Sequence, residues 1–509
     1  MNNSNHDHNK NTLSVKRMSI DTYRQPVLYM REDCHICRSE GFEALSRISV
    51  STGEKTIVGT LNIVRGNLLQ PGELGLSDAA WRQLSVVENE TVYLSHPEPV
   101  GSMKYVRSKI YGHMLSEAQL NEIMKDVVDG RYDDIQLSAF IAACAGNRLN
   151  LDEIIALTKS MINAGEHLSW DQKIIVDKHC VGGLPGNRTT LIVVPVVTAF
   201  GLVMPKTSSR AITSPAGTAD TMEILAPVNL SLEHMQNVVR KEGGCIVWGG
   251  AVHLSPADDI LIAIERQLDI DSEGQLIASV LSKKAAAGST HVLIDMPVGT
   301  TVKIRSMNLA RQLVDMMVAV GGEIGLNVRV KITDGQQPVG RGIGPALEAR
   351  DVLQVLQNDP AAPADLRERS LVLAGELLEI SGKVTDGEGY QEAKRVLENK
   401  MAWKKFQAIC EAQGGMSSPP VAEHRLEICS DRDGKVIAID NRRLALAAKL
   451  AGAPFAPAAG IDMHVKQDAL LVKGQPLYTI HAESPGELEY ALDYIKGQKD
   501  IISVGSGGP

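Results

Sequence analysis

The sequence predicts an α/β protein of several domains, and three observations lead to this prediction. The chain has 509 residues, which is more than one hydrophobic core usually organises. Its middle part alternates short apolar runs, glycine-rich loops and helical periodicities, the pattern of a sheet flanked by helices. Apolar residues make up 44% of the chain and aromatic residues only 4%. We therefore expect cores built mainly from aliphatic side chains.

The N-terminal part is expected to form a small β-rich domain that follows a short disordered tail. Residues 1–12 are polar and do not resemble a signal peptide. Residues 13–95 alternate short apolar runs, such as TIVGTLNIV and ETVYLS, with polar or glycine-containing turns. Cys34 and Cys37 form a C-x-x-C pair in this segment. An ordinary loop is the simpler interpretation of the pair, and a zinc site, which would need two more ligands at similar spacing, is the alternative.

Helical periodicity dominates residues 96–171. Ser116 and Gln119 have the spacing of a capping box, and apolar residues then recur at helical intervals until Gly130. A second helix is expected to follow Asn150 as its capping residue. Residues 172–425 are expected to form a large α/β domain that contains the active site, and strand-like runs in residues 426–509 indicate a small α+β domain at the C-terminal end.

The charge and hydropathy of the chain exclude several classes of partner. The formal net charge is -9 at pH 7, so no general attraction to nucleic acid or anionic membranes is expected. No stretch approaches the roughly 20 uninterrupted apolar residues of a membrane span. Seven cysteines, spread thinly over the chain, fit a reducing compartment better than a disulfide framework. We expect a cytoplasmic protein whose partner is a small molecule, with no nucleic-acid or membrane partner.

Two glycine-rich stretches carry the candidate chemistry. The first, DKHCVGGLPGNRTT at residues 177–190, follows a strand-like run and precedes LIVVPVVTAF. Its glycines let backbone amides approach an anion, while Lys178 and Arg188 supply charge. A helix that begins near Thr190 would add the positive end of its dipole, although Pro195 leaves a buried strand as the alternative. Taken alone, such a loop is equally well explained as a structural turn.

The second stretch, KTSSRAITSPAGTADTME at residues 206–223, is dense in hydroxyl groups. It resembles the signature of the thymidine and pyrimidine-nucleoside phosphorylases, in which S-x-R leads through G-T-x-D to a glutamate. SVLSKKAAAGSTH at 279–291 and ITDGQQPVGRGIGPALEAR at 332–350 resemble further blocks of this family in the same order. The resemblance covers roughly residues 100–490. The residues of the PGNRTT and SSRAITS segments are most similar to the long archaeal-type branch, which includes AMP phosphorylases.

The resemblance implies a fold and a reaction. A nucleoside phosphorylase-type helical domain, residues 96–171 completed by 257–288, would accompany the large α/β domain, with an N-terminal domain added. The implied enzyme is a pentosyltransferase that converts thymidine and phosphate to thymine and 2-deoxyribose 1-phosphate. The alternative is an AMP phosphorylase, which gives a base and ribose 1,5-bisphosphate. No cofactor or metal is expected beyond phosphate as co-substrate, and a homodimer or higher homo-oligomer is expected.

The resemblance also implies the residues of the site. The positions that hold phosphate correspond to Lys178, Thr190, Ser208 and Thr218. The positions that line the substrate correspond to Gly183, Ser209, Arg210, Ala211, Ile212, Thr213 and Ser214. Contacts to the base or nucleotide correspond to Ser279, Lys283 and Lys303. The candidate catalytic residues are Asp271, as a proton donor to the leaving base, and His179, as an electrostatic partner of that base.

Some of these positions have simpler interpretations. Asp271 precedes a helical pattern and can serve as its capping residue, and Lys303 can be a solvent-facing strand residue. Cys180 departs from the serine of pyrimidine-nucleoside members, so one hydroxyl contact is missing. The residues also leave open whether Asp271, Lys283 or His179 contributes most to departure of the base.

Three rival functions were weighed against the phosphorylase. An anthranilate-type phosphoribosyltransferase would share the fold but would use a magnesium diphosphate substrate, and no paired acidic motif stands at the expected place. A dinucleotide-binding protein would depend on Gly340, Gly342 and Gly344, whose spacing lacks the third glycine of that fingerprint. A nonenzymatic sensor that retains the cleft is the third alternative.

Overall fold

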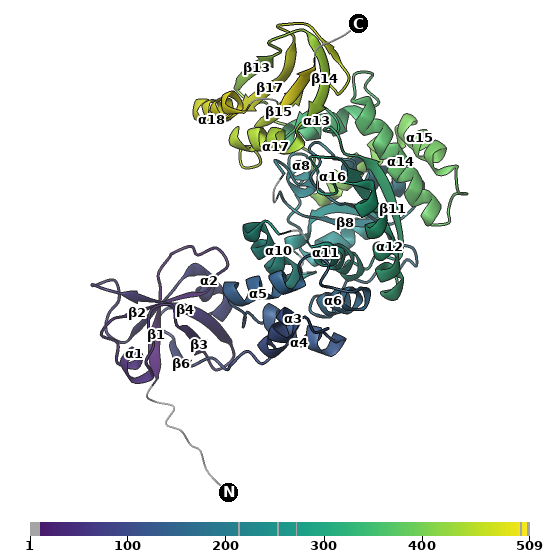
Figure 1. Ribbon diagram of the computed structural model, residues 1–509. Coiled ribbons are helices and arrows are strands. Elements are labelled where there is room, and N and C mark those ends of the chain that lie inside the picture. Colours follow the sequence, from purple (N-terminus) through teal and green to yellow (C-terminus); the bar gives the residue numbers. More distant parts are fainter. Residues whose placement is uncertain (1–10, 212–213, 252–253, 271, 499–500, 506–509) are drawn as a thin grey trace. The chain divides into compact units, whose positions relative to one another are not determined.

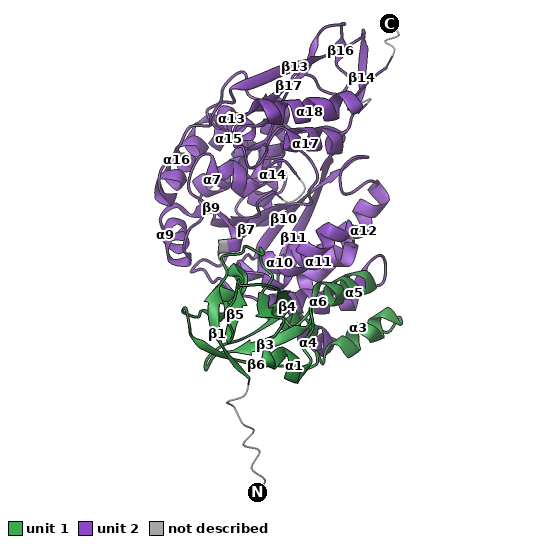
Figure 2. Cartoon of the chain, turned by 90° about the vertical axis from the view of Figure 1, so that its left-hand side faces the viewer, with its two compact units in different colours: residues 1–113, 122–143 green, residues 114–121, 144–509 purple. Residues whose placement is uncertain are grey.

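The computed structural model describes residues 11–211, 214–251, 254–270, 272–498 and 501–505 (Figure 1). The chain divides into two compact units (Figure 2). The first comprises residues 1–113 and 122–143, and the second comprises residues 114–121 and 144–509. None of the helices in the described ranges is long and apolar enough to cross a lipid bilayer.

The first unit contains a closed barrel in the segment expected to be β-rich. Its strands, in spatial order, are β1 (Thr12–Arg17), β5 (Glu73–Leu76), β2 (Val27–Arg31), β4 (Thr56–Val64), β3 (Arg47–Ser51) and β6 (Thr91–Ser95). The barrel closes because β1 pairs antiparallel with β6. Alternate residues point inward, as in β1, where Leu13 and Val15 are buried. Two short helices, α1 (His35–Glu40) and α2 (Asp78–Leu84), lie between the strands along the chain.

Helices follow the barrel, as the periodicity predicted. They are α3 (Met103–Ile110), α4 (Glu117–Val128), α5 (Asp134–Cys144) and α6 (Leu151–Asn163). The capping box before α4 is present, since the backbone amide of Gln119 lies 3.4 Å from Ser116 Oγ and the Gln119 side chain accepts from the Ser116 amide at 3.0 Å. Asn150 caps α6 in the same way, with Glu153 as its reciprocal partner.

Two helices that are distant in sequence complete the helical part of the second unit. They are α10 (Pro256–Leu268) and α11 (Glu273–Ala286), and α11 packs against α6. Gly274 allows this close approach, because a Cβ atom there would lie 2.9 Å from Leu149 Cδ1 and 3.1 Å from Ile154 Cγ1. A larger residue at this position would push the two helices apart.

The α/β part of the second unit is built on parallel strands. The sheet β11 (Asn327–Asp334), β10 (His291–Val298) and β7 (Val176–Cys180) lies beside the pair β8 (Met204–Ser208) and β9 (Gly244–Trp248). A bridge between Ile175 and Val203 connects β7 with β8. The carboxyl ends of β7 and β8 therefore lie at one edge, where ligands of open α/β sheets bind.

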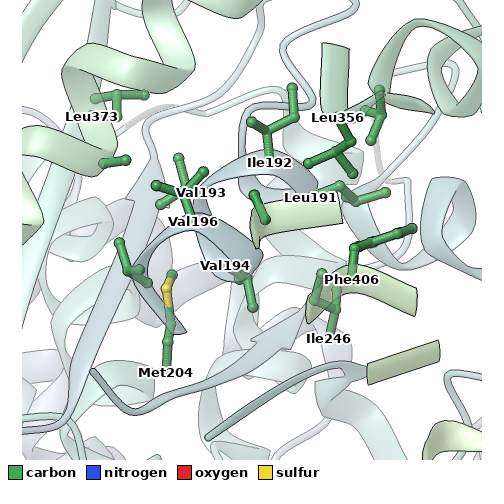
Figure 3. Close-up of a cluster of buried hydrophobic side chains, with 14 of the residues drawn as sticks. Leu191, Ile192, Val193, Val194, Val196, Met204, Ile246, Leu356, Leu373 and Phe406 are labelled. Atoms are coloured by element: carbon green, nitrogen blue, oxygen red, sulfur yellow. The ribbon is translucent and has the colours of Figure 1, made fainter. Parts of the chain in front are cut away.

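Helices surround these strands. They are α7 (Thr190–Phe200), α8 (Thr218–Glu223), α9 (Leu232–Glu242), α12 (Met307–Glu323), α13 (Pro345–Leu356), α14 (Ala364–Ile380), α15 (Gly389–Glu398) and α16 (Met401–Gln413). The segment that contains Pro195 is the helix α7, so the alternative of a buried strand is wrong. Residues 190–198 are all buried, because α7 lies at the centre of the largest aliphatic core (Figure 3).

The C-terminal part has two small sheets. The first contains β12 (Gly342–Ile343), β15 (Gly460–Met463), β17 (Pro476–Ala482) and β13 (His424–Cys429), and the second contains β16 (Leu470–Leu471), β14 (Gly434–Ile439) and β18 (Ile502–Gly505). Helices α17 (Asn441–Leu450) and α18 (Pro485–Gly497) accompany them. The strand β13 begins at His424, two residues before the expected boundary, and β12 comes from the α/β segment.

Phe406 provides a test of the core around α7. Its side chain is fully buried in the aliphatic cluster, whereas Phe455 is 96% exposed. We expect Phe406→Ala to destabilise the second unit by about 3–5 kcal/mol, because it removes a large side chain and leaves a cavity. Chemical denaturation followed by circular dichroism would measure this. Phe455→Ala is the matched control, and an equal loss in both variants would contradict the assigned core.

Candidate active site

Strand β7 presents candidate residues to both faces of the sheet. Because side chains alternate along a strand, Asp177 and His179 point to one face while Lys178 and Cys180 point to the other. Asp177 and Lys178 are each 1% exposed. The strand therefore supplies two separate polar clusters at the start of the first glycine-rich loop.

The Lys178 ammonium is held inside the protein by two partners. Its Nζ donates to Thr189 Oγ1 at 2.8 Å and lies 3.6 Å from Asp295 Oδ2. Asp295 is fully buried and also accepts from Thr333 and Asn187, at 2.6 and 3.0 Å. Burial opposes ionisation of Asp295, but the charges of Lys178 and an arginine outweigh it and keep the carboxyl pKa below its ordinary value. The positive charge of Lys178 is thus balanced by the negative charge of Asp295.

The first glycine-rich loop can adopt its path only with glycine at two positions. Gly183 and Gly186 have φ angles of +93° and +71°. A Cβ atom at Gly186 would lie 2.1 Å from the carbonyl oxygen of Val339, and one at Gly183 would lie 3.2 Å from the backbone nitrogen of Lys303. The loop is therefore packed tightly against two other segments, and Lys303 lies beside it.

Arg188 connects the first loop to the second. Its Nε donates to Glu348, its Nη2 donates to the carbonyl oxygen of Ala216 at 2.6 Å, and its Nη1 lies 3.4 Å from Thr218 Oγ1. Glu348, on α13, is 1% exposed, and burial raises its pKa although Arg188 acts in the opposite direction. The sequence suggested Arg188 as an anion ligand, whereas the structure gives its guanidinium partners within the protein.

The first loop ends where α7 begins. Thr189 is the N-cap residue, and Thr190, which is 5% exposed, is the first residue of the helix, as predicted. The amides of the first turn of a helix lack partners within the helix, so this end is suited to an anion.

The second loop is held by one carboxylate. Asp220 Oδ2 accepts from the backbone amides of Ala211 and Gly217, at 2.6 and 2.8 Å, and Oδ1 accepts from Arg210 at 3.1 Å. Gly217 permits this fold, because a Cβ atom there would lie 2.5 Å from the carbonyl carbon of Arg210. The loop is therefore built around Asp220 before any ligand binds.

Ser208 is distinguished from its neighbours by an unsatisfied hydroxyl group. It is the last residue of β8, and its buried Oγ has no hydrogen-bond partner within the described ranges. A buried hydroxyl without a partner is costly in the free protein, and it leaves a donor that a ligand could use. Ser209 is exposed, and Ser214 donates to the carbonyl oxygen of Ala216 at 2.8 Å.

Arg210 has structural partners of its own. Its guanidinium forms a bidentate ion pair with Glu223, at 2.5 and 2.8 Å, and lies over the ring of Trp248. The expected substrate contacts Ile212 and Thr213 lie outside the described residues, as does Asp271.

The other face of β7 carries a buried charged cluster. Asp177 accepts from Lys206 at 3.0 Å and from Lys284 at 2.7 Å. Burial lowers the pKa of Lys284, although Asp177 opposes this effect. Burial and then the positive charges of nearby lysines lower the pKa of His179 well below its ordinary value. His179 is therefore neutral near pH 7 and can offer a hydrogen bond, while its role toward the leaving base stays a prediction.

Helix α11 carries a positively charged residue, Lys283, whose charge acts on the neutral His179. Lys283 and Ser279 lie one turn apart, with Nζ 3.4 Å from Ser279 Oγ and 2.5 Å from Asp258 Oδ2. Burial alone would lower the pKa of Lys283, but the charge of Asp258 outweighs it and raises the pKa above its ordinary value. Lys283 is therefore a permanent cation whose charge also acts on His179.

The structure thus brings together residues from three of the sequence blocks, and it adds residues that sequence reasoning missed. The missed residues are carboxylates and lysines that hold the loops and strands in place: Asp177, Lys206, Asp220, Lys284, Asp295 and Glu348. Most of them stand within the same sequence blocks, directly beside the candidate ligands. Their chemical type was visible in the sequence, but their burial and pairing were not.

Comparison with known families matches three parts of the chain in order. Residues 103–165 match the helical bundle domain of a glycosyl transferase family, residues 172–403 match its a/b domain, and residues 435–501 match the pyrimidine nucleoside phosphorylase C-terminal domain. The chain belongs to the pyrimidine nucleoside phosphorylase family. It is accordingly a pentosyltransferase with a helical domain and an α/β domain.

Similar proteins agree with this family. A protein of Polaromonas sp. named "Putative thymidine phosphorylase" is 58% identical over 97% of this chain and 96% of its own length. A protein of the same name from Legionella pneumophila (strain Paris) is 57% identical, over 97% and 95%.

Two solved structures share the fold. Anthranilate phosphoribosyltransferase from Thermus thermophilus matches with a TM-score of 0.51 and 18% identity, over 60% of this chain and 98% of its own. The enzyme from Saccharomyces cerevisiae matches with a TM-score of 0.50 and 13% identity, over 61% and 97%. At this identity the likeness concerns the fold alone.

Ser208 provides a test of the anion site. We expect Ser208→Ala to raise the KM for phosphate by roughly tenfold, because the hydroxyl would donate to a charged ligand and has no hydrogen-bond partner to lose among the residues that the structure describes. Steady-state kinetics with phosphate as the varied substrate would measure this. Ser370→Ala is the control, since the Ser370 hydroxyl is equally buried but donates to Leu366 within α14. Unchanged phosphate kinetics in Ser208→Ala would remove Ser208 from the site.

Proposed function

We propose that the protein catalyses phosphorolysis of a pyrimidine nucleoside, converting thymidine and phosphate to thymine and 2-deoxyribose 1-phosphate. The observation that carries this proposal is the buried, unpartnered hydroxyl of Ser208 at the carboxyl end of β8, next to the strand that leads into the first glycine-rich loop. The names of the similar proteins and the match to the pyrimidine nucleoside phosphorylase C-terminal domain support the choice of substrate.

Phosphate binding would depend on groups from both loops. Ser208 and Thr218 would donate hydroxyl groups, and Thr190 would contribute from the first turn of α7. Lys178 would add positive charge beside the loop. Its ion pair with Asp295 would weaken the attraction of that charge for phosphate. Fixing phosphate in one orientation would convert a two-substrate encounter into an oriented attack, which lowers the entropic part of the barrier.

Departure of the base would depend on the other face of β7 and on α11. A phosphate oxygen forms a bond to the anomeric carbon while the bond from that carbon to the base nitrogen breaks, and the electron pair leaves with the base. Lys283 would stabilise the resulting negative charge, and His179 would offer a neutral hydrogen bond. The base then takes up a proton from solvent or, in the role we propose for it, from Asp271.

Phosphorolysis of AMP is the second candidate. It is favoured by the position of Lys303, whose backbone packs against Gly183 and so places a lysine beside the loop. Cys180 also stands where a serine would be expected for a pyrimidine nucleoside. Burial raises the pKa of its thiol to about 12, so Cys180 stays protonated near pH 7 and offers only a weak donor in place of the serine hydroxyl.

We further propose that the reaction takes place in the cytoplasm, that the protein works as a homodimer or higher homo-oligomer, and that neither nucleic acid nor a membrane is a partner. The net charge of -9 supports the last point. No cofactor or metal is proposed, because the hydroxyl groups, amides and lysines described above supply the charge stabilisation that the reaction needs.

The phosphate requirement is the first test of this proposal. We expect release of free base to require inorganic phosphate and to be unchanged after EDTA treatment, because the site binds its anion through protein donors. Chromatographic detection of base and pentose 1-phosphate would measure both. Activity that is lost with EDTA and restored by magnesium would contradict the proposal and favour a phosphoribosyltransferase.

The substrate is tested by comparing thymidine, uridine and AMP with the wild type and Asp271→Asn. We expect thymidine to be the preferred substrate. If a purine nucleotide is cleaved, Asp271→Asn should lower its turnover by roughly 100-fold or more, because a purine depends on a general acid. Thymidine cleavage should fall less, since Lys283 can stabilise a pyrimidine anion.

Asp269→Asn is the control for this comparison, because Asp269 is a nearby exposed carboxylate at the end of α10. Wild-type preference for AMP would overturn thymidine as the substrate. Equal and negligible effects of Asp271→Asn on every cleaved substrate would remove Asp271 from the candidate catalytic residues.

A further inference from the structure

The C-x-x-C pair lies where a barrel strand leads directly into a helix. Strand β2 ends at Arg31, Cys34 is the N-cap residue of α1, and Cys37 is the third residue of that helix. The backbone around the pair is well fixed, since the Cys34 amide donates to the carbonyl oxygen of Arg31 at 3.1 Å and the Phe42 amide donates to that of Cys37 at 2.9 Å. The two cysteines are therefore separated by one turn of a backbone that is held in place at both ends.

The two sulfur atoms differ in their surroundings. Cys34 is partly exposed, whereas Cys37 is 6% exposed and belongs to the barrel core together with Ile36. Both are free thiols. A partly exposed cysteine thus stands one helical turn before a shielded one, and this spacing suits a pair that can be joined by a disulfide.

A zinc site, the alternative for this pair, would need further ligands beside the two sulfur atoms. Among the described residues, no group of three or more His, Cys, Asp and Glu side chains is arranged to hold a metal ion. A structural zinc ion normally has four such ligands.

We propose that Cys34 and Cys37 form a redox-active dithiol that exchanges with low-molecular-weight disulfides. In this reaction the Cys34 thiolate attacks one sulfur atom of the disulfide R–S–S–R, forms a mixed disulfide and releases one thiolate, R–S⁻. Cys37 then loses its proton and attacks the Cys34 sulfur atom, which releases the second R–S⁻. The two cysteines are oxidised to a disulfide, and the small disulfide is reduced to two thiols.

The order of attack follows from the same contacts. The hydrogen bond from the Cys37 thiol, followed by the backbone amides of Cys37 and Ile36 and the charge of His35, lowers the pKa of Cys34. That hydrogen bond and burial raise the pKa of Cys37. Cys34 therefore carries the thiolate near pH 7 and attacks first, while Cys37 resolves the mixed disulfide.

This site is separate from the chemistry of the phosphorylase. The barrel contains none of the candidate active-site residues, and the cysteine in that site, Cys180, has a raised pKa and no cysteine partner: its Sγ accepts from Asn187. The dithiol can therefore be tested without reference to substrate turnover, and its failure would leave the proposed phosphorolysis unaffected.

The test treats the reduced full-length protein with oxidised glutathione and follows thiol content and intact mass. We expect the wild type to lose the Cys34 and Cys37 thiols together and to retain no glutathione on them. Cys37→Ala should trap glutathione on Cys34, because the resolving thiol is absent, and alanine fits the buried position. Cys34→Ser should show no rapid modification of Cys37. Cys429→Ser is the control, since Cys429 is exposed and has no neighbouring cysteine, and it should form the disulfide like the wild type.

A second measurement uses only the wild type. At pH 7 we expect iodoacetamide to alkylate Cys34 at least about tenfold faster than Cys429, with an advantage that grows as the pH falls, because the Cys34 thiolate persists at lower pH. The proposal would be overturned if both thiols survived an excess of oxidised glutathione. It would also be overturned if the wild type kept a mixed disulfide on Cys34 that Cys37 did not resolve. Alkylation of Cys34 no faster than that of Cys429 would overturn it as well.

Discussion

The buried ion pairs of Asp177 are the interaction on which the site depends. This one carboxylate binds Lys206 of β8 and Lys284 of α11, while its own strand carries Lys178 and His179. Three elements that carry candidate phosphate and base ligands are thereby fixed to each other. Removing Asp177 would leave two buried lysines without compensation, which is far more costly than the loss of a surface pair. Burial and, to a lesser extent, the same lysines lower the pKa of His179, so the cluster contributes to keeping this side chain neutral.

A second set of carboxylates gives the two loops their shape. Glu348 holds Arg188, which bridges the loops, and Asp220 gathers two amides of the second loop. Arg188 and Arg210 have the chemistry of anion ligands, but both are used to build the loops. The candidate phosphate ligands that are left are hydroxyl and amide groups, together with Lys178, whose charge is partly balanced by Asp295. Such a site is preorganised, because its donors are positioned by interactions that do not involve the ligand.

The C-terminal part of the chain supports the same loops from the other side. Lys466 donates to the carbonyl oxygens of Pro338 and Gly340, at 2.8 and 2.6 Å, and Asn441 donates to that of Gly335 at 3.0 Å. These contacts fix the segment whose Val339 packs against Gly186. The strand β12, which comes from the α/β segment, completes the first C-terminal sheet. The C-terminal domain therefore contributes to the site by stabilising a loop, without supplying a candidate ligand.

The sequence by itself determined the class of fold and the helix starts at Ser116 and Asn150, because capping and periodicity are local properties. The blocks that contain the candidate site were recognised through their resemblance to a family. The sequence left α7 undecided between helix and strand, since a segment buried on all sides shows no periodicity, and only the surrounding core made it a helix. Tertiary structure alone decided which polar candidates have partners within the protein and which do not. The unpartnered Ser208, the neutral His179, the compensated Lys178 and the paired arginines differ through burial and through partners distant in sequence, and neither property is encoded in any one segment of the chain.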